Sequence, residues 1–191
     1  MLIYIHGYGS NGLSEKARHY QKLFEGEAFL TPSLSTESRL AVHTLENIIQ
    51  AVGHHEKVGL IGSSLGGYFA IYLANKYKLP AVLINPAIPP WDQQSVLDGE
   101  NRPNMPQSFS WQAAHLERLS AYRVESPSQS LQQRLLLLQQ LDDEVLDAKL
   151  ALDYLPQAPQ IVTSGGGHRF RGIEQYDQSV LDFFAKFLKA D

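Results

Sequence analysis

The sequence predicts an α/β fold in which a mostly parallel sheet is covered by helices on both faces. Short apolar runs alternate with helix-like segments along most of the 191 residues, the pattern of strands joined by crossover helices. One of these runs, Val58 to Ile61, is followed by a glycine-rich turn and then by an apolar helix-like segment. We expect a single domain over residues 1–191, because this length suits one hydrophobic core. An insertion at about 87–130 interrupts the pattern.

The expected elements follow from periodicity and from the residues that end each run. The expected strands are 2–5, 28–30, 57–61, 81–84, 134–138 and 160–163. Helices are expected where apolar residues recur about every 3.6 positions: from near Ser14, from Ser35 or Thr36 as N-cap, over 68–77, over 145–155 and over 174–188. The helix over 68–77 is apolar almost all round, so we expect it to pack directly on the sheet.

The insertion has an unusual composition. The stretch 86–127 holds six of the ten prolines and both tryptophans. A connection this long is typical of a functional insertion, and its aromatic residues argue against a disordered excursion. We expect it to form a cap over the edge of the sheet, with a helix in 111–122.

Composition narrows the class of protein. The net charge is −4 and is spread along the chain, so no basic stripe indicates nucleic acid or an anionic membrane surface as a partner. The absence of cysteine excludes disulfides, thiolate metal sites and a cysteine nucleophile. No secretory leader is visible at the start, and the longest apolar runs are too short to span a bilayer. We therefore expect a soluble, cytoplasmic protein.

The turn Gly62-Ser63-Ser64-Leu65-Gly66-Gly67 carries the strongest chemical signal. It follows a predicted strand and precedes a predicted helix, the context in which G-x-S-x-G forms a nucleophile elbow with Ser64 at its tip. Glycines two residues either side of the serine fit a turn in which strand and helix approach closely. A glycine-rich turn that merely starts a helix is the alternative interpretation.

Two further loops at the carboxyl ends of predicted strands complete a candidate triad. His168 follows the strand 160–163 across a glycine-rich stretch, and acidic residues follow the strand 134–138. A serine hydroxyl needs an imidazole to take its proton, and the imidazole needs a carboxylate to orient it. We favour Asp143 as that acid because it lies two residues before a valine that enters the next helix. Asp142 and Glu144 stay alternatives.

The other histidines fit non-catalytic roles. His6 is expected to anchor the loop after the first strand through ring hydrogen bonds. The remaining five lie away from strand ends, where solvated or packing roles are favoured: His19, His43, His54, His55 and His115. His54 and His55 lack a third ligand at a suitable spacing, so no metal site is predicted.

Ester chemistry also needs donors for the oxyanion. The backbone N–H of Leu65, at the start of the elbow helix, is one candidate donor, and the N–H of Tyr8 in the loop after the first strand is the other. Gly7 and Gly9 would let that backbone approach the reacting carbon.

At this point the chain resembles the α/β-hydrolase superfamily, and within it the small bacterial esterases of the YqiA type, formerly an uncharacterised protein family. The matching motifs are Tyr4-Ile5-His6-Gly7-Tyr8, Gly62 to Gly67, Asn85-Pro86-Ala87, Gln139-Gln140 through Leu146, and Gly165-Gly166-Gly167-His168 before Phe170. The resemblance implies ester or acyl-CoA thioester hydrolysis without a cofactor, with Ser64, Asp143 and His168 at the triad positions. The chain departs from the expected pattern at Asp142, where a glycine is expected, and at Gly167, where an acid is expected.

The predicted function is therefore cleavage of small carboxylic esters or thioesters through an acyl-enzyme on Ser64. We expect Trp91, Phe109 and Trp111 of the cap to line an apolar acyl pocket. Arg169 is a candidate contact for an anionic substrate group, although an exposed arginine is the plainer interpretation. The alternatives are an acyltransferase or perhydrolase with the same triad, and a noncatalytic binding module on the same fold. Acyl chain length, leaving group and oligomeric state are left open.

Overall fold

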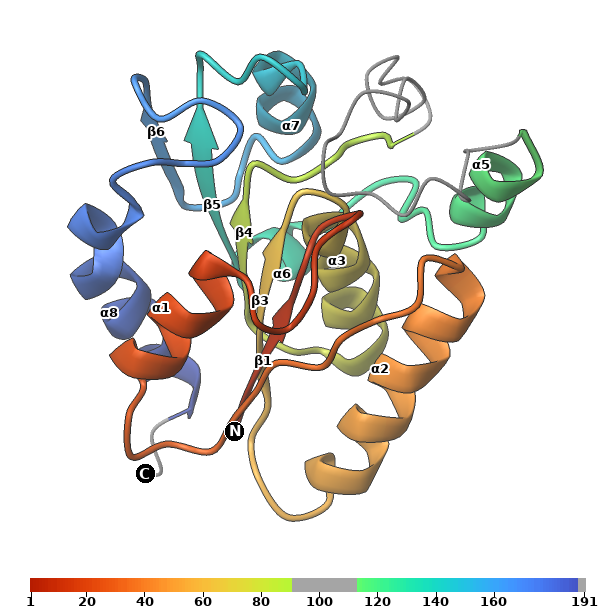
Figure 1. The fold of residues 1–191 in the computed structure, drawn as a ribbon, viewed down its shortest axis with the longest axis vertical. Helices are drawn as coiled ribbons and strands as arrows, with labels where there is room; N and C mark the ends of the chain where they lie inside the picture. Colours follow the sequence, from red (N-terminus) through yellow and green to blue (C-terminus); the bar gives the residue numbers. More distant parts are fainter. Residues whose placement is uncertain (91–112, 189–191) are drawn as a thin grey trace.

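The computed structural model describes residues 1–90 and 113–188, and its centre is a six-stranded parallel sheet (Figure 1). The strand order is β2-β1-β3-β4-β5-β6, and every neighbouring pair is parallel. The strands are β1 (Leu2–Ile5), β2 (Phe29–Leu30), β3 (Gly59–Ser63), β4 (Ala81–Ile84), β5 (Leu135–Gln140) and β6 (Gln160–Thr163). This confirms the predicted α/β class, and it brings the carboxyl ends of all strands to one edge.

Helices cover both faces of this sheet. The helices α1 (Glu15–Leu23) and α8 (Asp177–Leu188), with the 3₁₀ turn Ile173–Tyr176 before α8, pack on one face. The opposite face carries α2 (Ser38–Gly53), α3 (Leu65–Tyr77), α5 (Ala113–Ser120), α6 (Gln129–Gln132) and α7 (Ala148–Tyr154). Successive residues of β1 alternate between the two cores, as the period of two along a strand requires. The sheet is thus buried on both sides, which explains the near-continuous apolar runs.

Two expected helix starts are wrong, and in both helices an acidic side chain is the N-cap. The helix α2 begins at Ser38 with Glu37 as N-cap, since the Glu37 Oε2 accepts a hydrogen bond of 2.9 Å from the N–H of Leu40. Neither Ser35 nor Thr36 takes this place. The helix expected from Val145 begins only at Ala148, with Asp147 as N-cap.

The other boundaries shift by a few residues. The strand β5 continues to Gln140, α3 begins at Leu65 directly after the serine, and the last helix opens as a 3₁₀ turn. The helix expected within 111–122 is present as α5, whereas residues 91–112, half of the predicted cap, lie outside the described residues. No helix in the described parts of the chain has the length and apolarity needed to cross a membrane.

Candidate active site

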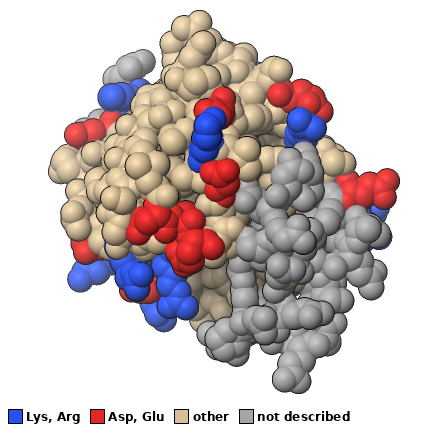
Figure 2. Space-filling view, turned by 90° about the horizontal axis from the view of Figure 1, so that it is seen from above, with Lys and Arg blue, Asp and Glu red and all other residues tan. Residues whose placement is uncertain are grey.

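The loops that follow β1, β3 and β6 meet at the carboxyl edge of the sheet around one cleft. The cleft has a volume of about 530 Å³, and Tyr8, Ser64 and His168 are among the residues that line it. Figure 2 views this edge from above, where acidic and basic side chains lie beside one another in small groups. The parallel order of the strands therefore brings residues 8, 64 and 168 to the same hollow.

Ser64 occupies a strained backbone conformation at the tip of the turn between β3 and α3. Its φ is 55° and its ψ is −122°, in a region that non-glycine residues rarely adopt. A Cβ at Gly62 would lie 2.4 Å from the Gly66 carbonyl oxygen, and one at Gly66 would lie 2.1 Å from the Ile5 carbonyl oxygen. The steric reason expected for these glycines is confirmed, and the turn has the geometry of a nucleophile elbow.

Hydrogen bonds from the neighbouring strand compensate this strain. The Ser64 N–H donates to the Ile84 carbonyl at 3.0 Å. The Ser64 carbonyl accepts from the N–H groups of Gly67 at 2.9 Å and Ala87 at 3.0 Å. The backbone on both sides of the serine is thus bonded to the chain that leaves β4, so the position of the hydroxyl is set by the sheet itself.

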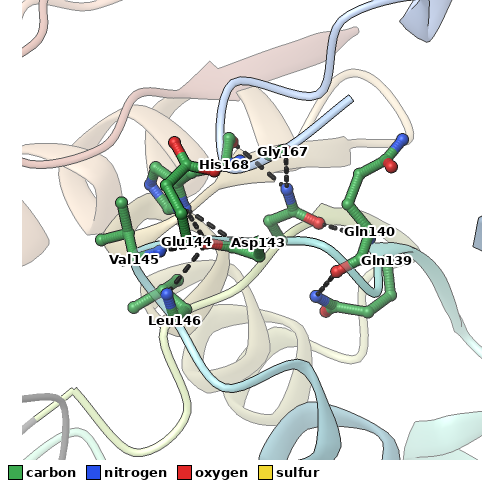
Figure 3. A network of polar contacts seen from close by, with 9 residues as sticks. Gln139, Gln140, Asp143, Glu144, Val145, Leu146, Gly167 and His168 are labelled. Carbon is green, nitrogen blue, oxygen red and sulfur yellow. Dashed lines mark hydrogen bonds and ion pairs between the residues drawn. The ribbon is translucent and has the colours of Figure 1, made fainter. Parts of the chain in front are cut away.

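The imidazole of His168 lies against the carboxylate of Asp143 (Figure 3). The His168 Nδ1 is 2.8 Å from Asp143 Oδ2 and 3.0 Å from Oδ1, although the two residues are 25 positions apart. The Asp143 side chain is fully buried, and its Oδ1 also accepts the N–H groups of Val145 and Leu146 at 2.9 Å each. A carboxylate in this place holds the proton on Nδ1 and leaves Nε2 as the acceptor.

The two backbone N–H groups that donate to Asp143 also explain why α7 starts later than expected. They hold Val145 and Leu146 in a loop around the carboxylate, so the helix begins after them. Asp142, the alternative acid, is exposed, and the contact with the imidazole is made by its neighbour.

Glu144 takes part in the site in a way that the sequence did not indicate. Its Oε2 accepts the backbone N–H of His168 at 2.9 Å. That bond, followed by one from its own N–H, lowers the pKa of the Glu144 carboxyl below its usual value, so it is ionised at neutral pH. The loop after β5 therefore contacts the loop after β6 twice, once at the His168 ring and once at the His168 backbone.

The loop after β1 is anchored by His6, as predicted. The His6 Nε2 accepts the N–H of Leu34 at 2.9 Å, so Nδ1 carries the proton and donates to the Gly7 carbonyl at 2.8 Å. Burial lowers the pKa of His6, which favours this neutral form. The loop passes directly over the elbow, since a Cβ at Gly7 would lie 3.1 Å from the Ser64 Cβ. Tyr8 and Leu65 border a common hollow of about 30 Å³ beside it.

The remaining predicted residues divide into two groups. Trp91, Phe109 and Trp111 lie outside the described residues, so the expected acyl pocket stays a prediction. Arg169 lines the cleft, together with Lys16 on α1, which the sequence did not indicate. Burial lowers the pKa of Lys16, and the charge of Arg169 adds to this effect while Glu15 opposes it. Within residues 1–90 and 113–188, no three acidic or histidine side chains form a metal-binding group.

A protein-family model, described as "Uncharacterised protein family (UPF0227)", matches residues 1–185. The chain belongs to the UPF0227 family. The match covers every strand of the sheet and all three loops that carry Ser64, Asp143 and His168.

Solved structures show that this UPF0227 protein has the α/β-hydrolase fold. Est1E from Butyrivibrio proteoclasticus with ferulic acid bound is 13% identical, with a TM-score of 0.73 over 97% of this chain and 88% of that one. Alpha/beta hydrolase domain-containing protein 10 from mouse is 18% identical, with a TM-score of 0.71 over 97% and 89%. The Pyrococcus furiosus esterase Pf2001 is 16% identical, with a TM-score of 0.70 over 98% and 82%. At these identities the likeness concerns the fold.

Proposed function

We propose that this protein is a serine hydrolase that cleaves carboxylic esters or acyl-CoA-type thioesters through an acyl-enzyme on Ser64. The observation that carries the proposal is the contact between the buried Asp143 carboxylate and the His168 ring, in the cleft that Ser64 also lines. An exposed imidazole on a surface loop would need no buried carboxylate behind it. The pairing matches the requirement of a general base that is oriented by a third group.

The first half-reaction forms the acyl-enzyme. The Ser64 Oγ bonds to the substrate carbonyl carbon while His168 Nε2 takes the hydroxyl proton and the carbonyl electrons move to oxygen. The resulting imidazolium is stabilised by Asp143. As the tetrahedral intermediate collapses, the bond to the leaving oxygen or sulfur breaks, and Nε2 returns the proton to that atom.

The second half-reaction repeats these steps with water. Nε2 takes a proton from water, the hydroxide bonds to the acyl carbon, and the acid leaves as Ser64 recovers its proton. In both halves the oxyanion is held by the backbone N–H groups of Leu65 and Tyr8. Leu65 is the first residue of α3, where backbone N–H groups have no partner within the helix.

The structural relatives support a hydrolase rather than a transferase or a binding protein. Pf2001 is described as an esterase and the mouse protein by its α/β-hydrolase domain, while Est1E holds ferulic acid. Acyl transfer to an alcohol or to peroxide uses the same acyl-enzyme and differs only in the acceptor. Product analysis with added alcohol or peroxide separates these activities from hydrolysis.

Replacement of the proposed nucleophile tests the function. We expect Ser64→Ala to abolish turnover of p-nitrophenyl esters and labelling by a fluorophosphonate probe while the circular dichroism spectrum and Tm stay those of a folded protein. Ser130→Ala, which changes an exposed serine on α6, should be labelled like the wild type. Full activity of Ser64→Ala would exclude the proposed nucleophile, and an unlabelled wild type would favour the noncatalytic alternative.

A further inference from the structure

The chain that leaves β4 lies at the centre of the three loops that carry the proposed triad. Asn85 follows this strand directly, is 1% exposed, and has a φ of 40°. Positive φ is uncommon outside glycine, and asparagine is among the residues that tolerate it best. A buried polar side chain in such a conformation is costly unless its hydrogen bonds are all made.

The Asn85 amide makes those bonds with the loop that carries His168 and with the end of β5. Its Nδ2 donates to the carbonyl of Gly167 at 3.1 Å and to that of His168 at 3.2 Å. Its Oδ1 accepts the N–H of Gln140 at 2.8 Å, at the end of β5, and Gln140 and Gly167 are labelled around this contact in Figure 3. Both hydrogens and the oxygen of one side chain therefore tie the base loop to the strand that leads to Asp143.

The residues on either side of Asn85 hold the elbow. The Ile84 carbonyl accepts the N–H of Ser64 and the Ala87 N–H donates to the Ser64 carbonyl, each at 3.0 Å. The four-residue segment 84–87 is thus bonded to the nucleophile turn, to the strand that precedes the acid, and to the loop that carries the base.

The loop that carries His168 needs such a tether because glycine restricts its backbone little. It contains Gly165, Gly166 and Gly167, and two of these have a positive φ, 99° at Gly165 and 58° at Gly167. Three glycines in a row cost conformational entropy when they are ordered, so contacts from outside the loop must hold it. The N–H of Gly166 donates to the Gln140 Oε1 at 3.0 Å, which holds this loop directly to the end of β5.

We propose that Asn85 is a positioning residue for the triad: its amide fixes the backbone of residues 167–168, and thereby the distance from the His168 ring to Ser64 and Asp143. The inference rests on the proposed function. No other small side chain would serve. An aspartate lacks the two donors and would direct negative charge at two carbonyls, and an alanine or leucine would leave those carbonyls and the Gln140 N–H without this partner.

Two replacements of Asn85 separate the side chain from its backbone conformation. Asn85→Asp keeps the shape of the side chain but replaces its NH₂ donors by an oxygen that only accepts. Asn85→Gly keeps the positive φ but removes the amide. We expect each to lower kcat for p-nitrophenyl butyrate by about 100-fold with KM nearly unchanged, because a displacement of about 1 Å at the reacting groups costs roughly this factor. The rate of fluorophosphonate labelling should fall in parallel. Asn47→Asp, an exposed change on α2, is the matched control.

A proton NMR spectrum distinguishes positioning from general destabilisation. The hydrogen between His168 Nδ1 and Asp143 should give a resolved downfield resonance in the wild type, which we expect to be broadened or lost in both Asn85 variants at temperatures well below their Tm. Wild-type kcat, labelling rate and resonance in a folded Asn85→Gly would overturn the inference, and so would a loss confined to KM. If Asn85→Asp fails to fold, Asn85→Gly alone decides. A wild type that is not labelled at all would instead refute the proposed function.

Discussion

Replacing Asp143 by asparagine should abolish most activity while leaving the fold intact. The Asp143 Oδ1 accepts two backbone N–H groups at 2.9 Å, and an asparagine oxygen can accept both in its place. The amide nitrogen would then face His168 Nδ1, where the carboxylate Oδ2 now lies at 2.8 Å. Because an amide NH₂ only donates, the ring must place its proton on Nε2, and that nitrogen can no longer take the Ser64 proton.

The size of the effect follows from this reversal of the ring. The same exchange in a serine protease triad lowers kcat by about 10⁴, which corresponds to about 5 kcal/mol of transition-state stabilisation. The free energy of unfolding should change far less, by about 1 kcal/mol, since both backbone bonds are kept and only their charge assistance is lost. A large loss of activity with a small loss of stability is thus the expected signature.

The assay compares Asp143→Asn with Asp142→Asn. Steady-state kinetics with p-nitrophenyl butyrate give kcat, and urea denaturation followed by circular dichroism gives the free energy of unfolding. The exposed Asp142 should tolerate the change in both measurements. A drop in kcat for Asp142→Asn alone would show that Asp142, and not Asp143, is the triad acid. A loss of activity in Asp143→Asn that only matches its loss of stability would mean that the buried carboxylate serves folding only.

Two further predictions concern the frame of the site. Gly66→Ala places a Cβ 2.1 Å from the Ile5 carbonyl and should destabilise the protein by about 3 kcal/mol or more, whereas Gly53→Ala meets open space and should be neutral or slightly stabilising in urea denaturation. Equal effects would contradict the close packing of the elbow. Since burial lowers the folded pKa of His6, the unfolded chain binds more protons just below about pH 6.5. The contribution of His6 to the free energy of unfolding should therefore be constant above that pH. Below it, this contribution should fall by at most about 1.4 kcal/mol per pH unit until the lowered folded pKa is reached. His6→Gln should remove that part of the slope in urea titrations at several pH values and exposed His43→Gln should keep it. An unchanged slope in His6→Gln would show that other groups cause it.

Local chemistry explains which parts of the fold were predictable. Strand and helix positions follow from apolar periodicity, and the elbow follows from glycines that only a close approach of strand and helix requires. The start of α1 near Ser14 was likewise predictable, and the structure shows Ser14 as its N-cap, with the Ser14 hydroxyl accepting the N–H of Ala17 three residues on. Such signals involve neighbours in the chain and survive without knowledge of the tertiary structure.

The late start of α7 shows where this reasoning fails. Residues 145 and 146 have the apolar pattern of a helix, but their N–H groups donate to Asp143, which in turn faces a histidine 25 positions away. The start of α2 was missed for a local reason, since a glutamate side chain took the capping role that shorter serine and threonine usually fill. Helix propensity favours a helical start at residue 145, but the position of Asp143 against His168 prevents it.

By itself the sequence determined the α/β class, the positions of the strands along the chain and the turn at residue 64, because each of these depends on patterns within a few residues. Only the tertiary structure decided that Asp143 and not Asp142 lies against His168, and that Asn85 and Glu144 hold the loop of that histidine. Residues 142 and 143 lie in the turn after β5, and the course of the chain through this turn decides which of the two side chains points inward. That course depends on contacts with β4 and with the loop after β6, which no local pattern records.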